Sequence, residues 1–405
     1  MSKVITDAKM IDELLSRGVE KIYPSASLLK KKLMTGEPIK LYCGYDPSAP
    51  SLHIGHAISF NKLSQFQKLG HKVVFLIGDF TGMIGDPTDK TAARKKLSRE
   101  EVLKNSKEYQ KQGASFLSFS GDNSAKLMYN SEWNDKLTFK DLIELSSNFT
   151  VQQMIQRDMF QERLKEEKPI YLHEFMYPLA QGYDSYAMDV DLEVGGNDQM
   201  FNMMRGRDLQ KVLRNKEKFV MTLKLLADDS GKKMGKSEGN TVFLDEKAND
   251  MFGKVMSWSD GLIINAFELC TQVPMSEIKT MKQQMTNNEV NPRDLKMKLA
   301  YEIVKIFHDK SSAQVAQDYF INTFQKKEIP DEIVEIKIKG KNRKIVDLLI
   351  EGSLVESKGE ARRLIEQGGI KIDGEVIKEV NTEIDLKEGM IIQRGKRQFI
   401  KIKLI

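Results

Sequence analysis

Two histidines three positions apart, His53 and His56, form the pair in this sequence whose chemistry is most suggestive. Gly55 lies between them and leaves room for a ligand to approach, and imidazole N–H groups can donate hydrogen bonds to phosphate oxygens. An apolar run at 39–43 precedes the pair, and an amphipathic stretch at 57–69 follows it. Strand, turn and helix in this order open a nucleotide-binding α/β domain, where the turn meets phosphate at a helix N-terminus. The same pair could instead be solvated or cap the helix.

A second loop carries groups that could bind an amino acid and phosphate. Residues 73–77 form a continuous apolar run, which is typical of a buried parallel strand. The loop at 78–87 follows it, at the position where open α/β sheets bind ligands. Asp86 in this loop could hold an ammonium group, and Lys90 and Arg94, slightly further along, could reach phosphates.

A polar stripe is predicted further along the chain. If this segment is helical, Tyr177, Gln181 and Asp184 fall at i, i+4 and i+7 and share one face. A phenol, an amide and a carboxylate on one face are suited to a polar binding pocket, although an exposed polar face would look the same. Pro178 is compatible with a helix that starts there, and Gly182 weakens the helix interior.

Two further segments suit a nucleotide. The glycine pair at 195–196 allows close approach of the backbone, and Asp198 just after it could accept hydrogen bonds from ribose hydroxyls. The segment 228–237 combines small residues with Lys233 and Lys236, which predicts a loop that brings two cations to a transferring phosphate. Taken alone, this second segment is an ordinary basic loop.

Length and composition limit the classes of protein. The chain has 405 residues, enough for two or three domains, with 40% hydrophobic and 30% charged residues, as in soluble globular proteins. It has no apolar run of 18 residues, so no transmembrane helix is expected. The N-terminus resembles no targeting signal, which favours the cytosol, and two cysteines are too few for a disulfide framework or a zinc site. The net charge is only +5, but basic residues gather at 232–236, 337–344 and 394–403, which suits either a polyanion or a solvated surface.

The N-terminal part of the chain divides into predicted elements. Residues 1–38 are predicted to be a helical lead-in, and 128–133 to end another short strand. Capping boxes start helices after Ser98 and after Thr150. The helical pattern at 139–164 is interpreted as an insertion between two halves of the sheet.

The C-terminal part is predicted to hold a helical region, a linker and a separate small unit. Residues 246–323 read as helical throughout, and 328–341, with a proline and a glycine, read as a linker. The last unit begins at 343, with a short basic helix and then a hairpin-like turn, features that suit binding to a phosphate backbone. The basic residues of that helix are Lys358, Arg362 and Arg363.

Two motifs together resemble a known family. The sequence 53–56, His-Ile-Gly-His, and the sequence 233–237, Lys-Met-Gly-Lys-Ser, resemble in type and order the two signatures of class I aminoacyl-tRNA synthetases. Tyr42, Asp86 and the polar stripe resemble the amino-acid pocket of the bacterial tyrosyl-tRNA synthetases. The C-terminal unit resembles their S4-type RNA-binding domain. The resemblance covers nearly the whole chain.

The resemblance implies a reaction and its site. The enzyme would make tyrosyl-adenylate from tyrosine and ATP, with Mg²⁺ expected to accompany ATP and no metal site on the protein, and would then transfer tyrosine to the 3′-terminal adenosine of tRNA(Tyr). It assigns catalytic roles around the pyrophosphate to Ser48, His53, His56, Lys90, Arg94, Lys233 and Lys236. It assigns tyrosine binding to Tyr42, Asp86, Tyr177, Gln181, Asp184 and Gln199. It assigns ATP binding to Cys43, Gly44, Asp46, Gly55, Gly196, Asp198, Met234, Lys236 and Ser237. It assigns RNA binding to Lys358, Arg362 and Arg363.

Within this site, Tyr42 and Asp184 would hydrogen-bond the phenol of the substrate. Phenylalanine would leave these groups unpaired, a discrimination of which tyrosyl-tRNA synthetases are themselves the standard example. The tyrosine carboxylate is already a nucleophile, so no general base is needed and the barrier lies in crowding negative charge at the α-phosphate. No editing domain is expected.

The implied fold is an α/β protein with a Rossmann-like parallel-sheet catalytic domain, an α-helical domain and a small α+β S4-like domain. The implied boundaries are 1–228 for the catalytic domain, 229–326 for the signature loop and helical domain, 327–342 for a linker and 343–405 for the RNA-binding domain. The insertion at about 131–165 would be the interface of a homodimer. The implied partners are tRNA(Tyr), tyrosine and ATP, with no membrane, in the cytoplasm.

Departures from the family pattern are small. Ser48 replaces the usual threonine and keeps its hydroxyl, and Gly235 replaces a frequent serine but leaves both signature lysines in place. Three alternatives remain. Tryptophanyl-tRNA synthetase shares the fold and both signatures, but Tyr42, Asp184 and the S4-like unit argue against it. A non-catalytic RNA-binding relative should have lost a signature histidine or lysine. An unrelated nucleotidyltransferase would not need the RNA-binding unit.

Overall fold

The computed structural model describes residues 3–86, 97–227, 241–325, 333–340, 342–395 and 398–405. The chain forms two compact units, Met1–Ala313 and Gln314–Ile405, and each is described by itself. The expected site residues Lys90, Arg94, Lys233, Met234, Lys236 and Ser237 lie outside the described residues.

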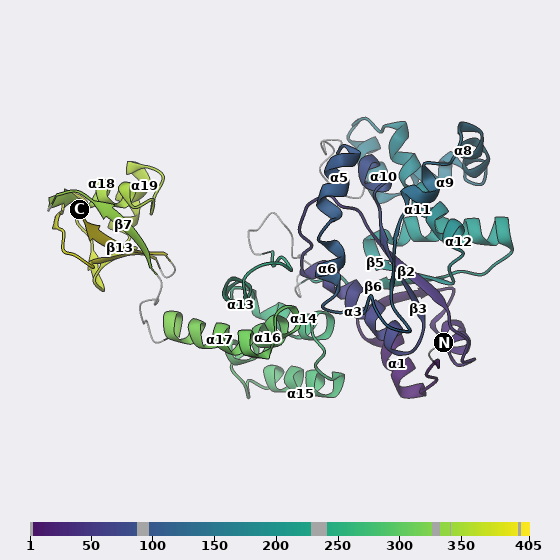
Figure 1. The fold of residues 1–405 in the computed structure, drawn as a ribbon, viewed down its shortest axis with the longest axis horizontal. Coiled ribbons are helices and arrows are strands. Elements are labelled where there is room, and N and C mark those ends of the chain that lie inside the picture. The colour runs from purple at the N-terminus through teal and green to yellow at the C-terminus, as the bar shows by residue number, and fades with distance from the viewer. Residues whose placement is uncertain (1–2, 87–96, 228–240, 326–332, 341, 396–397) are drawn as a thin grey trace. The chain divides into compact units, whose positions relative to one another are not determined.

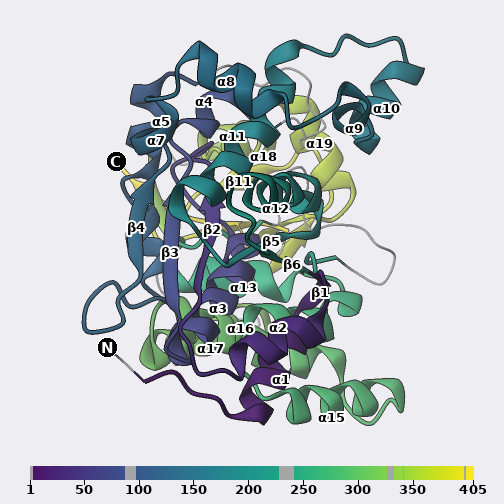
Figure 2. The ribbon, with the colours of Figure 1, turned by 90° about the vertical axis from the view of Figure 1, so that its right-hand side faces the viewer.

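A six-stranded sheet forms the centre of the first unit (Figure 2), in the order β1-β6-β5-β2-β3-β4. The strands from β6 to β4 are parallel to one another, whereas β1 is antiparallel to β6. Their bounds are Val19–Tyr23 for β1, Lys40–Tyr45 for β2, Lys72–Ile77 for β3, Lys126–Tyr129 for β4, Leu192–Gly196 for β5 and Phe219–Leu223 for β6. The apolar runs at 39–43 and 73–77 therefore became two central strands, as predicted.

The order of strands places a switch point between β2 and β5. The chain leaves β2 through α3 (Ile54–Lys68) toward β3 on one side, and leaves β5 through α12 (Met200–Arg214) toward β6 on the other. With right-handed crossovers, these two helices cover opposite faces of the sheet. Ligands of open α/β sheets bind at such a point, beyond the carboxyl ends of the strands.

The other helices of the first unit surround this sheet (Figure 1). The two predicted capping boxes are confirmed, since Ser98 caps α5 and Thr150 caps α9 with reciprocal side-chain bonds. The helical pattern predicted for 139–164 is also confirmed, as three short helices. The bounds are α1 Ala8–Ser16, α2 Ala26–Leu33, α4 Thr81–Ile84, α5 Arg99–Ser106, α6 Tyr109–Gly113, α7 Ser131–Asn134, α8 Phe139–Ser146, α9 Val151–Ile155, α10 Asp158–Lys165 and α11 Leu172–Met188.

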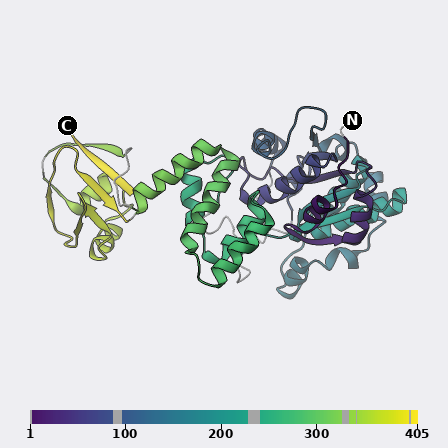
Figure 3. The same cartoon turned by 90° about the horizontal axis from the view of Figure 1, so that it is seen from below.

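Within the region predicted to be helical after residue 246, the helices α13 to α16 form a packed group, green in Figure 3. Helix α16 packs on α13 and α14, and α14 also packs on α15 and α3. Asn291 caps α16, and Pro292 occupies its first position, where the missing N–H costs nothing. The bounds are α13 Ala248–Met256, α14 Ile263–Cys270, α15 Met275–Thr286, α16 Pro292–Phe307 and α17 Lys310–Phe320, with short 3₁₀ turns at Asn197–Gln199 and Asp260–Leu262 and a π turn at Ile321–Gln325.

Two predictions about the first unit were wrong. Residues 1–38 are not only helical, because β1 lies between α1 and α2 and pairs with β6. Helix α11 does not start at Pro178 but at Leu172, so the proline lies inside it. This proline is buried with the face of α11 that packs on α12, and that packing outweighs the local preference against proline.

Gly182 in the same helix has a packing reason. A Cβ there would come within 3.2 Å of the backbone of Arg205 and Gly206 on α12. The glycine therefore allows α11 and α12 to cross closely, and it does not disturb the helix that carries the polar stripe.

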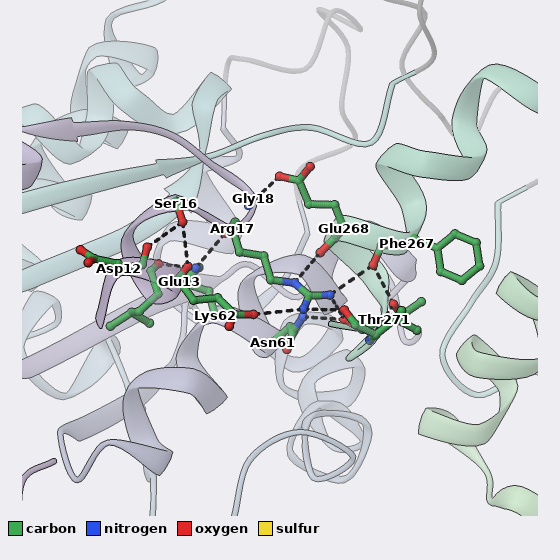
Figure 4. A network of polar contacts seen from close by, with 12 residues as sticks. Asp12, Glu13, Ser16, Arg17, Gly18, Asn61, Lys62, Phe267, Glu268 and Thr271 are labelled. Atoms are coloured by element: carbon green, nitrogen blue, oxygen red, sulfur yellow. Dashed lines mark hydrogen bonds and ion pairs between the residues drawn. The ribbon is translucent and has the colours of Figure 1, made fainter. Parts of the chain in front are cut away.

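A buried polar network joins α1, α3 and α14 (Figure 4). The ammonium of Lys62 on α3 donates to the carbonyls of Leu14, at 2.6 Å, and Arg17, at 2.9 Å. The guanidinium of Arg17 donates in turn to carbonyls at the end of α14, among them Thr271 at 2.7 Å. Each cation donates to carbonyls that the end of a helix leaves unpaired. The network therefore holds α3, the helix that begins at the histidine pair, against the ends of α1 and α14.

Acid stability should depend on His71, which is fully buried beside β3 and accepts a hydrogen bond from the Ile39 N–H. Burial lowers its pKa from 6.5 to about 4. Between these values the unfolded chain binds a proton that the folded chain does not, so stability falls as the pH drops from about 6.5 to 4. His71→Gln keeps an acceptor but cannot be charged.

Relative to this variant, wild type should lose about 3 kcal/mol of unfolding free energy between pH 7.5 and 4. Urea titrations of both proteins across that range measure the difference. Parallel stability curves for the two proteins would show that His71 does not titrate in this way.

The second unit has its own core and its own sheet (Figure 1). A five-stranded sheet has the order β10-β9-β12-β13-β7, and β8 pairs with β11 in a separate ladder. The bounds are β7 Val334–Ile338, β8 Asn342–Lys344, α18 Ile345–Glu351, α19 Lys358–Glu366, β9 Ile370–Ile372, β10 Glu375–Ile377, β11 Glu383–Asp385, β12 Ile391–Arg394 and β13 Gln398–Leu404.

The linker predicted at 328–341 was wrong for residues 334–338. These residues form β7, which pairs in parallel with β13 from Val334 opposite Ile400 to Ile338 opposite Leu404. Ile338 joins the core of this unit, so the segment belongs to a folded sheet. The chain on either side of β7 carries the proline and glycine that suggested a linker.

Candidate active site

The expected site residues gather where β2 and β5 separate. The two strands pair at Leu41 with Leu192 and at Tyr42 with Glu193, and the pairing stops there. On its other side, β2 stays paired with β3 as far as Tyr45. The carboxyl ends of β2 and β5 therefore diverge at the switch point, and the backbone of Gly44 is exposed there.

The histidine turn caps the helix that it starts. His53 is the N-cap of α3 and accepts a hydrogen bond from the Gly55 N–H at 3.2 Å, while Nδ1 of His56 accepts from the His53 N–H at 3.1 Å. The two rings lie 4.1 Å apart, centroid to centroid. The capping alternative is thus confirmed, and it also leaves both half-buried rings at a helix N-terminus, where an anion is favoured.

The segment after the predicted lysine loop returns to this turn. Ile54 donates to the carbonyl of Val242 and Leu244 donates to that of Leu52, both at 2.9 Å, and His53 pairs with Phe243 in an antiparallel bridge. The residue just before the loop, Ala227, accepts a hydrogen bond from Asn265 on α14 at 2.9 Å. Both ends of the lysine segment are therefore fixed to the first unit.

Asp184 on α11 is a buried carboxylate with a dense set of donors. Its Oδ1 accepts from Trp133 at 2.7 Å and from Asn134 at 3.0 Å, and its Oδ2 accepts from Asn130 at 3.1 Å. Burial raises the pKa of Asp184 to about 8, although these three donors act to lower it. Such a group is an acceptor that the surrounding side chains hold in one orientation.

Tyr42 lies on β2, fully buried, and its hydroxyl is 2.9 Å from that of Ser185 on α11. Ser185 donates to Glu193 at 3.2 Å, and Glu193 forms a buried ion pair with Lys218. Burial and then the charge of Glu193 raise the pKa of Tyr42 well above its usual value, so Tyr42 stays a neutral phenol.

The stripe residues Tyr177 and Gln181 each reach a different carboxylate. Tyr177 donates to Asp46 at 2.8 Å, and Asp46 also accepts from Thr81 at 2.6 Å. Burial raises the pKa of Tyr177 well above its usual value. Gln181 donates from Nε2 to Glu193 at 3.0 Å. The stripe predicted from spacing therefore exists and is largely buried, so the exposed-face alternative is wrong.

Asp86 and Gln199 come together from two different loops. Nε2 of Gln199 donates to Asp86 at 2.6 Å, and the guanidinium of Arg157 lies 3.6 Å from the other oxygen of the carboxylate. Asp86 follows α4, and Gln199 follows the glycine pair of β5, so this contact spans the two sides of the switch point. A half-buried carboxylate of this kind can bind a cationic ligand group.

The remaining predicted nucleotide residues flank the same edge. The thiol of Cys43 is buried, and burial raises its pKa to about 11, so it acts as a small neutral wall residue. Ser48 lies in the turn after β2, where its N–H donates to the Asp46 carbonyl at 2.7 Å. A Cβ on Gly196 would come within 2.5 Å of the exposed Asp198 carboxylate, so this glycine gives the carboxylate room in its present position.

The three basic residues predicted on the C-terminal unit all lie on α19 and are exposed. Lys358 pairs with Asp347 at 2.9 Å. They belong to the second unit and are described only within it.

Several side chains of the site were not anticipated. These are the donors to Asp184, the linking hydroxyl of Ser185, the Glu193–Lys218 pair and Arg157. One signal was present in the sequence: Glu193 stands inside an apolar strand, where a carboxylate is rarely left without a partner.

The described part of the chain lacks two other features, a metal cluster and a membrane-spanning helix. Across these ranges no His, Cys, Asp and Glu side chains form a group of three or more that could hold a metal ion. Nor does any described helix have the length and apolar character needed to cross a bilayer.

Comparison with known proteins identifies the family. The model for tRNA synthetases class I (W and Y) matches residues 34–325, and that for the tyrosine–tRNA ligase SYY-like C-terminal domain matches residues 325–402. A tyrosine–tRNA ligase of Haemophilus influenzae is 45% identical over 401 residues, covering 99% of this chain and 98% of that protein. One of Moorella thermoacetica is 42% identical over 393 residues, covering 96% of this chain and 94% of that protein.

Solved structures agree with this result. The crystal structure of a C-terminally truncated mitochondrial tyrosyl-tRNA synthetase from Coccidioides posadasii matches with a TM-score of 0.63 at 27% identity, covering 76% of this chain and 91% of that chain. The tyrosyl-tRNA synthetase of Archaeoglobus fulgidus, at 18% identity and a TM-score of 0.60, shares the fold. The chain belongs to the class I tRNA synthetases of the tryptophan and tyrosine group.

Proposed function

We propose that this tyrosine–tRNA ligase activates L-tyrosine at the divergent ends of β2 and β5 and then charges tRNA(Tyr). The carboxylate of tyrosine attacks the α-phosphate of ATP, a carboxyl–phosphate bond forms, and the bond to pyrophosphate breaks. A hydroxyl of the 3′-terminal adenosine of the tRNA then attacks the activated carbonyl, and AMP leaves. Neither step needs a covalent enzyme intermediate.

The strongest support is the placement of Tyr42 and Asp184. Tyr42 on β2 hydrogen-bonds Ser185 on α11, and Asp184, the preceding residue of α11, accepts from three side chains of the segment after β4, so both are buried and held by hydrogen bonds. We assign them to the phenol of the substrate. A ligand without a phenol O–H would make no hydrogen bond to either group inside this buried site, which is costly.

The ammonium of tyrosine is assigned to Asp86, Tyr177 and Gln181. Asp86 supplies a carboxylate, while Tyr177 and Gln181 present an oxygen from one face of α11. Gln199 bonds Asp86 and is assigned to the carboxylate side of the substrate. An ammonium has three N–H donors, which suits three acceptors of this kind.

ATP is assigned to the turn after β2 and to the glycine pair of β5. Ser48, His53 and His56 would contact the phosphates, and Asp198 the ribose. Lys233 and Lys236 would stabilise the charge that develops on the pyrophosphate. Val242, which follows Lys236 by six residues in the sequence, accepts a hydrogen bond from Ile54 in the histidine turn. Lys90 and Arg94 are assigned to the same phosphates.

Mg²⁺ would enter with ATP. Magnesium keeps most of its waters and is usually held by substrate phosphates rather than by a cage of protein ligands. The described residues contain no grouped set of ligands that would compete for it.

The proposed division of labour follows the sequence. Residues 1–228 would activate tyrosine, 229–326 would carry the signature loop and the helices on the anticodon side, and the RNA-binding domain would comprise β7 together with 343–405. The exposed Lys358, Arg362 and Arg363 would contact phosphates of the tRNA. The enzyme would work in the cytoplasm.

Charging tests this function directly. With bacterial tRNA, ATP and labelled tyrosine, the protein should produce acid-precipitable tyrosyl-tRNA, and labelled tryptophan should give none. If the protein charged tRNA with tryptophan alone, the substrate would be tryptophan and not tyrosine. If it activated tyrosine but charged no tRNA, the RNA-binding role proposed for the C-terminal unit would be wrong.

We also propose that the enzyme is a homodimer joined through the region near 131–165. Large apolar side chains are exposed in this region and shortly after it, with Phe139 78%, Val151 71% and Leu172 82% exposed. Three such residues, on α8, α9 and α11, favour a protein partner, and a second copy is the partner that a symmetric interface requires. Val315 is equally apolar and 61% exposed, but lies elsewhere.

The double variant Phe139→Glu/Leu172→Glu should therefore be a monomer. Light scattering coupled to size exclusion should give the mass of two chains for wild type and one for the variant, because four charges would be buried at the interface. Val315→Glu is the matched control and should remain a dimer. A wild-type protein with the mass of one chain would exclude the interface.

A further inference from the structure

A buried ion pair lies beneath the amino-acid side of the site. Glu193 on β5 is 1% exposed, and Lys218, just before β6, is fully buried. The ammonium of Lys218 also donates to the Met203 carbonyl at 3.1 Å. A Cβ on Gly206 would come within 2.6 Å of this ammonium and 2.5 Å of the Ser185 hydroxyl, so α12 leaves a space that fits the pair.

Glu193 collects donors from three directions. Lys218 contacts Oε2, Ser185 donates to the same oxygen at 3.2 Å, and Gln181 donates to Oε1 at 3.0 Å. An ionised carboxylate can only accept hydrogen bonds, and an ammonium can only donate them. Lys218 therefore keeps Glu193 in the form that accepts from all of its neighbours.

The acceptor-only form of Glu193 fixes the orientation of the Gln181 amide. Because Glu193 offers no proton, Gln181 must turn its NH₂ group toward it, and its carbonyl oxygen must face the other way. That oxygen, Oε1, is buried and has no hydrogen-bond partner among the residues that the structure describes. A buried carbonyl without a donor is costly, and an ammonium is a donor that would satisfy it.

We propose that Glu193 and Lys218 are a positioning pair that fixes the amide of Gln181, so that its carbonyl oxygen accepts from the ammonium of the amino acid. This inference rests on the role proposed above for Gln181. If the pair only joined β5 to β6, it would stabilise the fold but would have no selective effect on binding of the substrate ammonium.

The variant Glu193→Gln tests the inference, because an amide of the same shape can donate as well as accept and so lets Gln181 turn over. Two ligands separate the effects: L-tyrosine, and 3-(4-hydroxyphenyl)propionate, which lacks only the ammonium. Affinity for L-tyrosine should fall by roughly tenfold or more, the cost of one hydrogen bond to a charged group. Affinity for the propionate should stay within about twofold.

Removing only the carboxylate leaves Lys218 unpaired and could prevent folding. The double variant Glu193→Gln/Lys218→Met removes both charges and should show the same selective loss for L-tyrosine. Glu217→Gln, the same change at an exposed neighbour, should alter neither affinity. The KM for ATP should be unchanged in all three variants.

The outcomes separate two failures. An equal loss for both ligands, or no loss for L-tyrosine, would overturn the positioning role and leave the proposed function intact. A wild-type protein that binds neither ligand, as measured by calorimetry or by inhibition of tyrosine-dependent exchange, would overturn the proposed function and this inference with it.

Discussion

Replacing Asp184 with asparagine should lower kcat/KM for tyrosine by roughly a hundredfold. Three N–H groups, from Trp133, Asn134 and Asn130, converge on this carboxylate. An asparagine would set its own NH₂ against at least one of them and would lose an oxygen that can accept from the phenol. Opposing two buried donors and losing a buried acceptor costs up to about 3 kcal/mol, and this corresponds to the stated factor. Tyrosine-dependent pyrophosphate exchange measures it.

The neighbouring helix end provides a matched control. Asp189 caps α11 in a left-handed conformation that asparagine also tolerates, and it is exposed. Asp189→Asn should leave exchange unchanged. An Asp184→Asn enzyme that kept wild-type kcat/KM for tyrosine would remove Asp184 from the substrate site.

Replacing Lys236 with alanine should lower kcat for tyrosyl-adenylate formation by about 10²–10³-fold, the usual cost of one preorganised donor to transition-state charge. The KM for ATP should change little. Lys236 lies outside the described residues, and its role is argued from the reaction, in which negative charge develops on the pyrophosphate as it departs. Single-turnover kinetics with saturating tyrosine separates the two parameters.

Lys232→Ala is the control for a basic residue in the same segment and should retain activity. The pattern of kinetic change decides the assignment. A higher KM for ATP with kcat unchanged would mean that Lys236 binds the ground state, which contradicts a role in the transition state.

Local signals in the sequence predicted much of the first unit. Capping boxes at Ser98 and Thr150 depend on residues three positions apart, and both formed. The apolar runs that became β2 and β3 are buried on both faces, so their composition alone identifies them. Predictions of this kind succeed because neighbouring residues carry all the information.

The errors arose where distant packing decides the structure. In β1, a register irregularity between Val19 and Lys21 breaks the alternation that marks a strand. In β7, Val334 is exposed while Ile338 is buried, and the charged residues between apolar ones resembled a linker. Pro178 lies buried inside α11, a helix that packs extensively on α12, and a local pattern does not contain such packing.

The sequence predicted which residues form the site, but not the hydrogen bonds and ion pairs that join them. Spacing along one helix was enough to group Tyr177, Gln181 and Asp184. The pairing of Glu193 with Lys218 depends on the register of β5 with β6, which places Glu193 beside Val220. No pattern within a short window contains that register, so the residue that orients Gln181 could be found only in the structure.

The central claim is that this site activates tyrosine. Amino-acid-dependent ATP–pyrophosphate exchange, run with tyrosine, tryptophan and phenylalanine side by side, tests it most directly. The account predicts exchange with tyrosine alone, because only a phenol satisfies both Tyr42 and Asp184. Exchange supported by tryptophan or phenylalanine at the same rate, or no exchange with any of the three, would contradict it.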